Sequence, residues 1–583
     1  MNRCSLMSAA RSLSCSLVFA LSFQPSLVMA QSTNDNTIFL NQAWSQEDRE
    51  WYYHFSQGSA ALSYDIFLNL EVPESQNLFR SDVNSERYGL IPEAASSYNP
   101  DGLPIGISKT TVTEAVKGWR VGDYAGLTCA ACHEEQWNYK GKRIRIEGAT
   151  SHALDLQAYV RALDEALRAT LADAAKFDRL AARVGASGVG PTKNELRERM
   201  QSEAAYIHEY STRTAATPHS WGPGRMDALT MINNRLTSIL TGIDQNSSTP
   251  IAPVKPPFLW NAPQGLWTQW AGIAQDPIYR NMTETAGSYL PIDLRSKTPA
   301  EGLFQSAAHV AELERVEDQL ARLAPPSWPE DVFGKIDRAK AARGKALFVE
   351  LCAGCHNAWP YRWTEPNKYG KRFVIVGLTP QSYVGTDRTQ FEAVRRFAIT
   401  GDVRKYFPPE FKDKEVLPSE IYFLLLQDSL IETALKQLNL TEAQAAHLHG
   451  YRELPIPPPP QDVYKAAPRD GVWATAPFMH NGSVPNLYEM LIPAAQRTKK
   501  FWLGGDFDPV KVGFDTSATS GTFLMDTTLL GNSNAGHSFQ EGARGYGTIG
   551  PLLTDEQRWA LVEYLKSIPE QAGRVTPFGG PSQ

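Results

Sequence analysis

Cysteine is scarce in this sequence, with 6 among 583 residues. Two of them, Cys4 and Cys15, lie in the first 30 residues, where basic residues precede a short apolar run at 13–23. Such a start, followed by small residues just before position 31, is typical of a cleaved secretory signal peptide. The apolar run is too short to anchor the chain across a bilayer as a helix. We therefore predict a signal peptide over residues 1–30 and an exported protein, periplasmic or secreted, that keeps four thiols.

Long apolar runs and an excess of positive charge are also missing. No stretch after residue 30 approaches 18 consecutive apolar residues, so the sequence predicts a chain that does not span a membrane. Acidic residues outnumber basic ones by 63 to 57 and the isoelectric point is near 6.1, which argues against nucleic acid as a partner. With 42% hydrophobic residues, the chain is long enough for two or more ordinary globular domains.

The four remaining thiols fall in two copies of C-x-x-C-H, at 129–133 and 352–356. This is the attachment motif of c-type haem, in which two thiols form thioethers with the vinyl groups and the histidine ligates iron. A redox C-x-x-C or half of a zinc site would explain one copy, but two copies that both end in histidine favour haem. We predict two covalent haem c groups and no disulfide. The attachment residues are Cys129, Cys132, Cys352 and Cys355, and the proximal iron ligands are His133 and His356.

Each iron keeps a second axial position, whose occupant decides between an electron-transfer centre and a reactive one. His537 is a candidate because it ends the Gly/Asn-rich loop 531–537, although a surface position is the ordinary alternative. His480 and Met479 are rival ligands, since methionine also ligates cytochrome c haem. At the first haem, the sequence leaves open whether a further histidine reaches the iron. The histidines concerned are His152, His208, His219 and His309.

The expected fold is mainly α, with two cytochrome c-like haem domains, long irregular insertions and few short strands. Apolar residues at helical spacing predict the helices, and alternation predicts a strand at 142–147. The segment 249–290 is rich in proline and aromatic residues, and we expect an ordered loop there, neither helix nor strand. A capping box at 554–557 predicts the start of a final helix. The other predicted helices cover 154–171, 194–213, 226–240, 307–323 and the stretch from 341 into Cys352.

We predict a domain boundary at the proline-rich stretch Pro325–Pro329. It divides the mature chain into an N-terminal haem domain with insertions, 31–328, and a C-terminal cytochrome c-like haem domain, 329–583. A run of four prolines at 457–460 interrupts the second domain, where we expect a rigid linker or surface arm.

Together with the two haem motifs, the segment Ala476–Ser483 (A-P-F-M-H-N-G-S) resembles the bacterial dihaem cytochrome c peroxidase superfamily. The greater length, the loop at Phe258-Leu259-Trp260 and the Gly536-His537 loop resemble its oxygenase branch, which holds dihaem rubber oxygenases, fatty-acid dioxygenases and diol synthases. The resemblance implies that His537 joins His356 on the second iron. It also implies that the haem on His133 keeps an exchangeable face for O2, with Phe258 and Trp260 in the distal pocket. The alternative is that these rings are ordinary core.

The function that this resemblance implies is a periplasmic oxygenase. It would add O2 to a long-chain unsaturated fatty acid such as oleate and release a hydroperoxide of the 10-hydroperoxide type. Its partners would be the fatty acid, O2 and a redox donor protein. Alternatives on the same scaffold are a hydroperoxide isomerase (fatty-acid diol synthase) and a polyisoprene-cleaving oxygenase. A cytochrome c peroxidase that reduces hydrogen peroxide and a plain electron carrier also remain open.

Overall fold

The computed structural model describes residues 36–185, 190–455, 462–568, 575–576 and 580–581. The predicted signal peptide and the four-proline run at 457–460 lie outside the described residues. The described part is mixed and mostly helical, which agrees with the expected class in its coarse form. Strands are more numerous than expected, although none that is described exceeds six residues.

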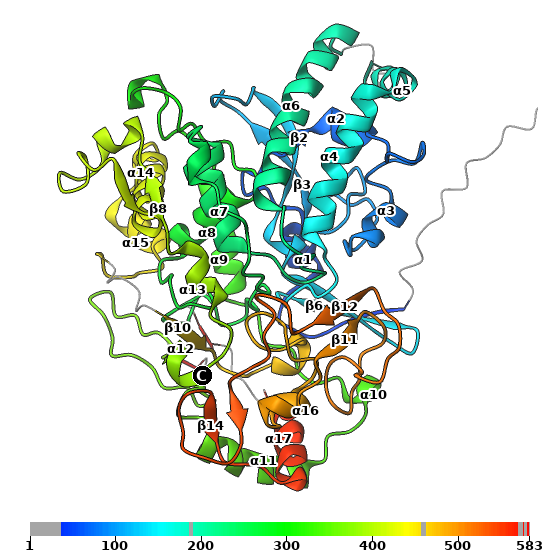
Figure 1. Ribbon diagram of the computed structural model, residues 1–583, viewed down its shortest axis with the longest axis vertical. Coiled ribbons are helices and arrows are strands. Elements are labelled where there is room, and N and C mark those ends of the chain that lie inside the picture. Colours follow the sequence, from blue (N-terminus) through cyan, green and yellow to red (C-terminus); the bar gives the residue numbers. More distant parts are fainter. Residues whose placement is uncertain (1–35, 186–189, 456–461, 569–574, 577–579, 582–583) are drawn as a thin grey trace, which may run out of the picture.

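The elements follow one another along the chain as drawn in Figure 1. The α-helices are α1 (Gln46–His54), α2 (Tyr64–Asn69), α3 (Asp82–Arg87), α4 (Leu156–Ala172), α5 (Ala174–Val184), α6 (Lys193–Thr214), α7 (Ala228–Asn234), α8 (Pro277–Gly287), α9 (Val310–Leu320), α10 (Glu330–Phe333), α11 (Arg338–Leu351), α12 (Gln381–Val384), α13 (Thr389–Val394), α14 (Ser419–Lys436), α15 (Glu442–Leu448), α16 (Leu487–Met490) and α17 (Asp555–Ser567). The strands are β1 (Thr37–Phe39), β2 (Leu62–Ser63), β3 (Ile107–Val112), β4 (Gly122–Leu127), β5 (Glu134–Tyr139), β6 (Lys142–Glu147), β7 (Gly377–Pro380), β8 (Phe397–Ile399), β9 (Val416–Pro418), β10 (Val463–Ala466), β11 (Lys500–Leu503), β12 (Phe523–Asp526), β13 (Ser538–Phe539), β14 (Thr548–Gly550), β15 (Val575–Thr576) and β16 (Gly580–Pro581).

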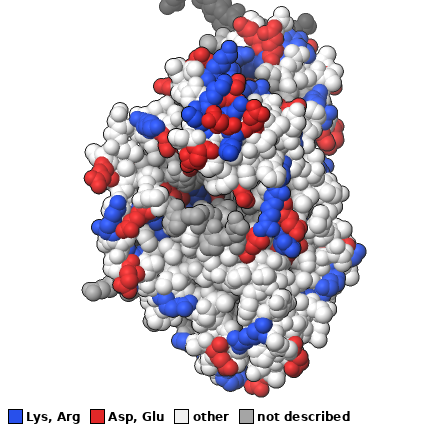
Figure 2. All heavy atoms as spheres, turned by 60° about the vertical axis from the view of Figure 1, so that its left-hand side comes forward, with Lys and Arg blue, Asp and Glu red and all other residues white. Residues whose placement is uncertain are grey.

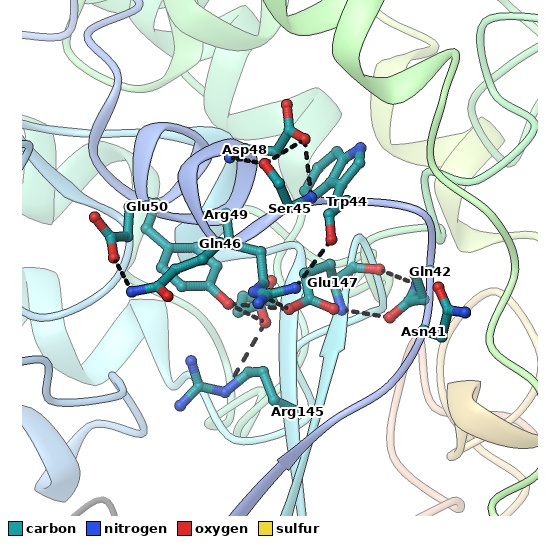
Figure 3. Close-up of polar contacts among 12 residues, drawn as sticks. Asn41, Gln42, Trp44, Ser45, Gln46, Asp48, Arg49, Glu50, Arg145 and Glu147 are labelled. Carbon is teal, nitrogen blue, oxygen red and sulfur yellow. Dashed lines mark hydrogen bonds and ion pairs between the residues drawn. The ribbon is translucent and has the colours of Figure 1, made fainter.

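Two small sheets flank the first haem motif in the sequence. The sheet of order β2-β4-β3 lies wholly before it, and the sheet of order β1-β6-β5 takes β5 and β6 from the residues after it, with β5 beginning directly after His133, and β1 from the start of the described chain. The start of the described chain is fastened to β6 (Figure 3), where Gln42 exchanges two hydrogen bonds with the main chain of Glu147, at 2.9 and 3.0 Å. Arg49 of α1 lies 3.6 Å from the Glu147 carboxylate. These contacts hold α1 against the motif, and the Tyr52 hydroxyl of α1 donates to the His133 carbonyl at 3.2 Å.

Amphipathic helices enclose separate parts of the core. The faces of α4, α5 and α6 share a buried cluster with β3 and β4. A second cluster joins α7 and α8 to β8, β9 and α14, so residues from the predicted second domain pack on helices of the first (Figure 1). The expected strand at 142–147 and the helices α4, α6, α7 and α9 are confirmed.

The expectation of a loop throughout 249–290 is wrong, because α8 occupies its last part. The side chain of Asp276 caps the helix by accepting from the Ile278 and Tyr279 amides, and Pro277 stands at the first helical position, where no N–H is needed. Proline and aromatic composition concealed this start signal. The helix supplies three of the side chains that surround the first haem motif.

The C-terminal part brings α11 and α17 together at the bottom of Figure 1. Gly344 permits the close crossing, since a β-carbon there would lie 1.9 Å from the Ala560 carbonyl oxygen. Thr554 and Gln557 form the predicted capping box at the start of α17. This crossing of the first and last helices is the arrangement expected of a cytochrome c domain.

The proline-rich stretch at the predicted boundary is packed into the interior. Trp328 is buried against Phe333 and Trp473, and the indole N–H of Trp473 donates to the Pro326 carbonyl at 2.9 Å. The largest core cluster contains residues from both sides of position 328, from Trp44 to Leu565. The division at 328/329 stays a prediction, and the two sides share a core.

Candidate haem sites

Both C-x-x-C-H segments adopt the same tight turn. In each one the histidine amide donates to the carbonyl of the first cysteine at 2.9 Å, and the last cysteine amide donates to the same carbonyl at 3.2 or 3.1 Å. Thr128 caps the first turn, while the second follows directly on the end of α11. All four cysteines are free thiols. The repeated turn places two thiols and one imidazole together at each motif, which is the donor set that haem c attachment requires.

At the second motif, His356 faces His537. The ring centres are 6.3 Å apart, and the planes are inclined by 52°. Two metal–nitrogen bonds of about 2 Å each, with about 1 Å from each nitrogen to its own ring centre, add up to about 6 Å. The spacing therefore fits one iron held between the two imidazoles.

The loop that carries His537 is preorganised by its neighbours. Gly536 has a φ of +73°, and a β-carbon there would lie 2.3 Å from the backbone of Gly385, so only glycine fits. The His537 amide donates to Val384 at 2.8 Å. The buried guanidinium of Arg497 donates to the carbonyls of Asn534, Gly536 and His537 at 2.7–2.8 Å. These contacts hold the backbone of the loop at the position from which His537 faces His356.

Burial lowers the pKa of the imidazoles of His133, His356 and His537. Burial lowers the pKa of His133 to about 4. Burial together with Arg497 and Arg469 lowers that of His537 to about 3, and burial together with Arg469 and His537 moves that of His356 well below its usual range. A metal ligand must offer an unprotonated nitrogen, so this electrostatic setting suits iron.

The rival ligands are engaged elsewhere. His480 stacks on Tyr464 with ring centres 4.2 Å apart, and its Nε2 lies 3.1 Å from the Tyr464 hydroxyl. The sulfur of Met479 accepts from the Ser483 hydroxyl at 3.5 Å. Neither has a recorded ring or polar contact with His356 in the described part of the chain.

At the first motif, a small cavity lies beside Cys129 and His133. Its apolar wall comes from the 257–259 loop and from α9, and Phe258 is on that wall. The lining residues are Cys129, His133, Pro257, Phe258, Leu259, Ala262, Thr268, Gln269, Arg280, Asn281, Glu284, Val316, Glu317, Leu320 and Lys465.

Phe258 and Trp260 occupy different positions at this cavity. Phe258 is half-buried and lines it, whereas Trp260 is 1% exposed and is not among the lining residues. The two rings stack with centres 4.7 Å apart and planes inclined by 17°. The indole N–H of Trp260 donates to the Asp470 carbonyl at 2.8 Å. Trp260 therefore supports the cavity wall from behind.

The polar part of the lining wall comes largely from α8 and α9. Arg280 forms a buried ion pair with Glu317, which also accepts from the Asn281 amide at 2.9 Å. The amide of Gln269 donates to Glu284, and burial raises the pKa of the Glu284 carboxyl despite the nearby Arg280. This wall places a carboxyl group with a raised pKa and a guanidinium next to the first haem motif. Composition and periodicity did not single out these residues.

No histidine or methionine other than His133 lines this cavity among the described residues. His152 pairs with Glu135 at 2.5 Å and stacks on Trp137. The other three histidines left open by the sequence bond to distant groups. His208 contacts Asp164, His219 contacts the Leu530 carbonyl, and His309 contacts the Thr111 carbonyl. The two motifs therefore differ: one histidine faces a second imidazole and the other faces a cavity.

Other binding features are absent from the described part of the chain. It contains no group of three or more His, Cys, Asp or Glu side chains arranged to hold a bare metal ion. None of its helices combines the length and apolar character needed to cross a bilayer. On the face drawn in Figure 2, acidic and basic side chains are interspersed rather than gathered by sign.

Comparison with known proteins gives one family model and two relatives. Residues 463–503 match the model described as RoxA-like, cytochrome c-like, which indicates a haem c protein. Uncharacterized protein y4iJ of Sinorhizobium fredii is 31% identical over 579 residues, covering 92% of this chain and 94% of that protein. Uncharacterized protein y4iM of the same organism is 27% identical over 353 residues, covering 55% of this chain and 67% of that protein.

Proposed function

The chain belongs to the family of the Sinorhizobium fredii protein y4iJ, and we propose that it is a periplasmic dihaem c-type cytochrome that adds O2 to a long-chain unsaturated fatty acid such as oleate. The observation that carries the proposal is the difference between the two motifs. His356 faces a second imidazole across 6.3 Å, while His133 faces a cavity with an apolar wall. One site thus suits electron transfer, and the other suits chemistry on a substrate.

Each haem would be held by residues already in position. Cys129, Cys132 and His133 hold the first haem, and Cys352, Cys355 and His356 hold the second together with His537. When bound in the first site, haem c supplies an iron that activates dioxygen. Gly354 and Cys355 are exposed, which supports docking of a redox donor protein at the second site.

The apolar wall would bind and orient the acyl chain. A fatty-acid chain is recognised mainly by shape and apolar contact, which Phe258 and Leu259 provide from one loop and Val316 and Leu320 provide from α9. Phe258 is stiffened by its stack on Trp260. A stiff wall restricts which carbon of a flexible chain reaches the reaction centre and excludes water from it. We therefore propose that this loop sets the position of the acyl chain in the cavity, and with it the carbon that is oxygenated.

The test is product analysis after incubation of the holoprotein with oleate under labelled dioxygen. The proposal predicts a hydroperoxide of the 10-hydroperoxide type that carries both labelled oxygens and forms only when O2 is present. A diol formed from added hydroperoxide without O2 would instead identify a hydroperoxide isomerase, and carbonyl fragments from polyisoprene would identify a cleaving oxygenase. No O2 uptake with oleate from a preparation that carries both haems would reject the proposal.

A second candidate, a peroxidase that reduces hydrogen peroxide, is favoured by Glu284. Peroxide cleavage needs an acid/base group beside the iron, and the Glu284 carboxyl lines the cavity with a pKa raised by burial. Glu284→Gln keeps the shape of the side chain and removes its acid/base function. Under the peroxidase alternative it should lower peroxide-dependent oxidation of reduced cytochrome c by roughly 10²-fold or more. Under the oxygenase proposal, oleate-dependent O2 uptake should stay within a few-fold of wild type.

A further inference from the structure

One short stretch of chain touches both haem sites. Lys465, in β10, lines the cavity beside His133, while its main-chain amide donates to Trp270 at 2.7 Å. Two residues later, the Ala467 carbonyl oxygen lies 3.0 Å from Nδ1 of His356. Arg469 follows, with its Nε 2.9 Å from the same His356 nitrogen. The stretch 465–469 therefore brings one cation to each site.

The two contacts at His356 Nδ1 cannot both be hydrogen bonds. A neutral imidazole carries one proton, and iron ligation through Nε2 requires that proton to be on Nδ1. Nδ1 then donates to the Ala467 carbonyl, and the N–H of Arg469 points at a donor instead of an acceptor. Ligation of iron by His356 thus leaves the Arg469 guanidinium in need of another acceptor.

Neither cation has a carboxylate partner among the described residues. Nearby cations have partners of their own. Arg280 pairs with Glu317, and the Lys255 ammonium donates to the carbonyls of Thr475 and Pro477. Both side chains are half-buried. A cation that is partly removed from water without a counter-charge favours an anion, so this pair is suited to one that the protein itself does not supply.

We propose that Lys465 and Arg469 form a carboxylate-binding pair between the two haem sites. Arg469 takes a carboxylate on the His356 side, and Lys465 takes one in the His133 cavity. The inference rests on the two haems of the proposed function, because each haem carries two propionate carboxylates. A fatty acid carries the same group, and its carboxylate is the other source. At Arg469 the haem source is favoured, since His537 already occupies the face of His356 where a substrate would approach.

The test compares charge-removing and charge-conserving variants of the holoprotein. Lys465→Gln and Arg469→Gln remove the cation, while Lys465→Arg and Arg469→Lys keep it, so folding defects and charge effects are separated within each pair. Haem stain on a denaturing gel first verifies that each variant carries both haems. Protein without covalent haem would count against the proposed function and not against the carboxylate-binding pair. The haem propionates are labelled with carbon-13 by growing the cells on labelled 5-aminolaevulinate, a haem precursor. Infrared difference spectra between the oxidised and reduced protein then follow the labelled carboxylate bands. In a separate sample, carboxyl-labelled oleate is followed in the same way, and its dissociation constant is measured by calorimetry.

If haem carboxylates are bound, the labelled propionate band shifts in both glutamine variants and returns in the charge-conserving variants. If Lys465 holds the fatty acid, the labelled oleate band shifts instead, and the dissociation constant for oleate rises roughly tenfold or more in Lys465→Gln. Both results support the pair and identify the source of its ligand. Wild-type propionate and oleate bands in both glutamine variants would overturn the proposal. So would a changed axial-ligand spectrum at the first haem in Lys465→Gln, which would make the amine an iron ligand.

Discussion

Replacement of Phe258 and Trp260 by alanine separates a cavity wall from its support. Trp260 is 1% exposed and donates to Asp470, so Trp260→Ala should cost about 3–5 kcal/mol of folding free energy, as for other large buried rings. Phe258 is half-buried and faces a cavity. Its removal forfeits the stack on Trp260, worth about 0.5–1.5 kcal/mol, and part of its apolar burial, which together come to about 1–2 kcal/mol.

The effect on the reaction product should be larger for Phe258→Ala than for Trp260→Ala, the reverse of the order of lost stability. Phe258→Ala widens the cavity beside His133, so the oleate chain can slide and the oxygenated carbon should change or spread over neighbours. Phe258→Leu keeps an apolar wall and should retain more of the wild-type product. Trp260→Phe keeps the stack and loses one hydrogen bond, which costs about 1 kcal/mol, so it provides a foldable control with unchanged products.

The assay combines thermal unfolding of the haem-loaded protein with mass spectrometry of products from oleate under labelled O2. The reasoning predicts a larger fall in melting temperature for Trp260→Ala and a larger change in product position for Phe258→Ala. It would be refuted if Phe258→Ala unfolded as early as Trp260→Ala while its folded fraction oxygenated oleate at the wild-type carbon and rate.

Three further predictions concern attachment, ligation and stability. Cys352→Ala should lower the covalent haem per chain on a denaturing gel, leaving the first site loaded, and unchanged stain would exclude attachment there. His537→Ala should open the second iron to added imidazole or cyanide in visible spectra, and a spectrum that still shows two strong axial ligands at that haem would assign the position to another residue. Hydrogen bonds and ion pairs from Arg179 and Arg183 lower the pKa of Glu71 to about 2 against an ordinary value of 4.5, so its folding stabilisation is present above pH 4.5 and is lost as pH falls toward 2. Glu71→Gln should therefore lower the melting temperature at pH 7, and a difference from wild type that did not shrink between pH 4.5 and 2 would contradict this.

Local chemistry determined much of what the sequence predicted. C-x-x-C-H places its donors by spacing alone, and both copies form the same turn. The alternation at 142–147 and the capping box at 554–557 likewise depend on neighbours within a few residues, and both predictions are confirmed. The helix α8 was missed because the composition around it is that of a loop, although Asp276 and Pro277 form a start signal that a residue-by-residue reading could have found.

Only the tertiary structure decided which distant groups meet. One histidine among 11 faces His356, and no periodicity links the loop of His537 to the second motif. The cavity beside His133 is assembled from a loop, two helices and β10, so Glu284 and Lys465 become its lining only after the chain has packed. A motif specifies contacts that covalent spacing enforces. The cavity and the unpaired cations beside it arise from burial, which depends on the packing of segments that are remote in sequence.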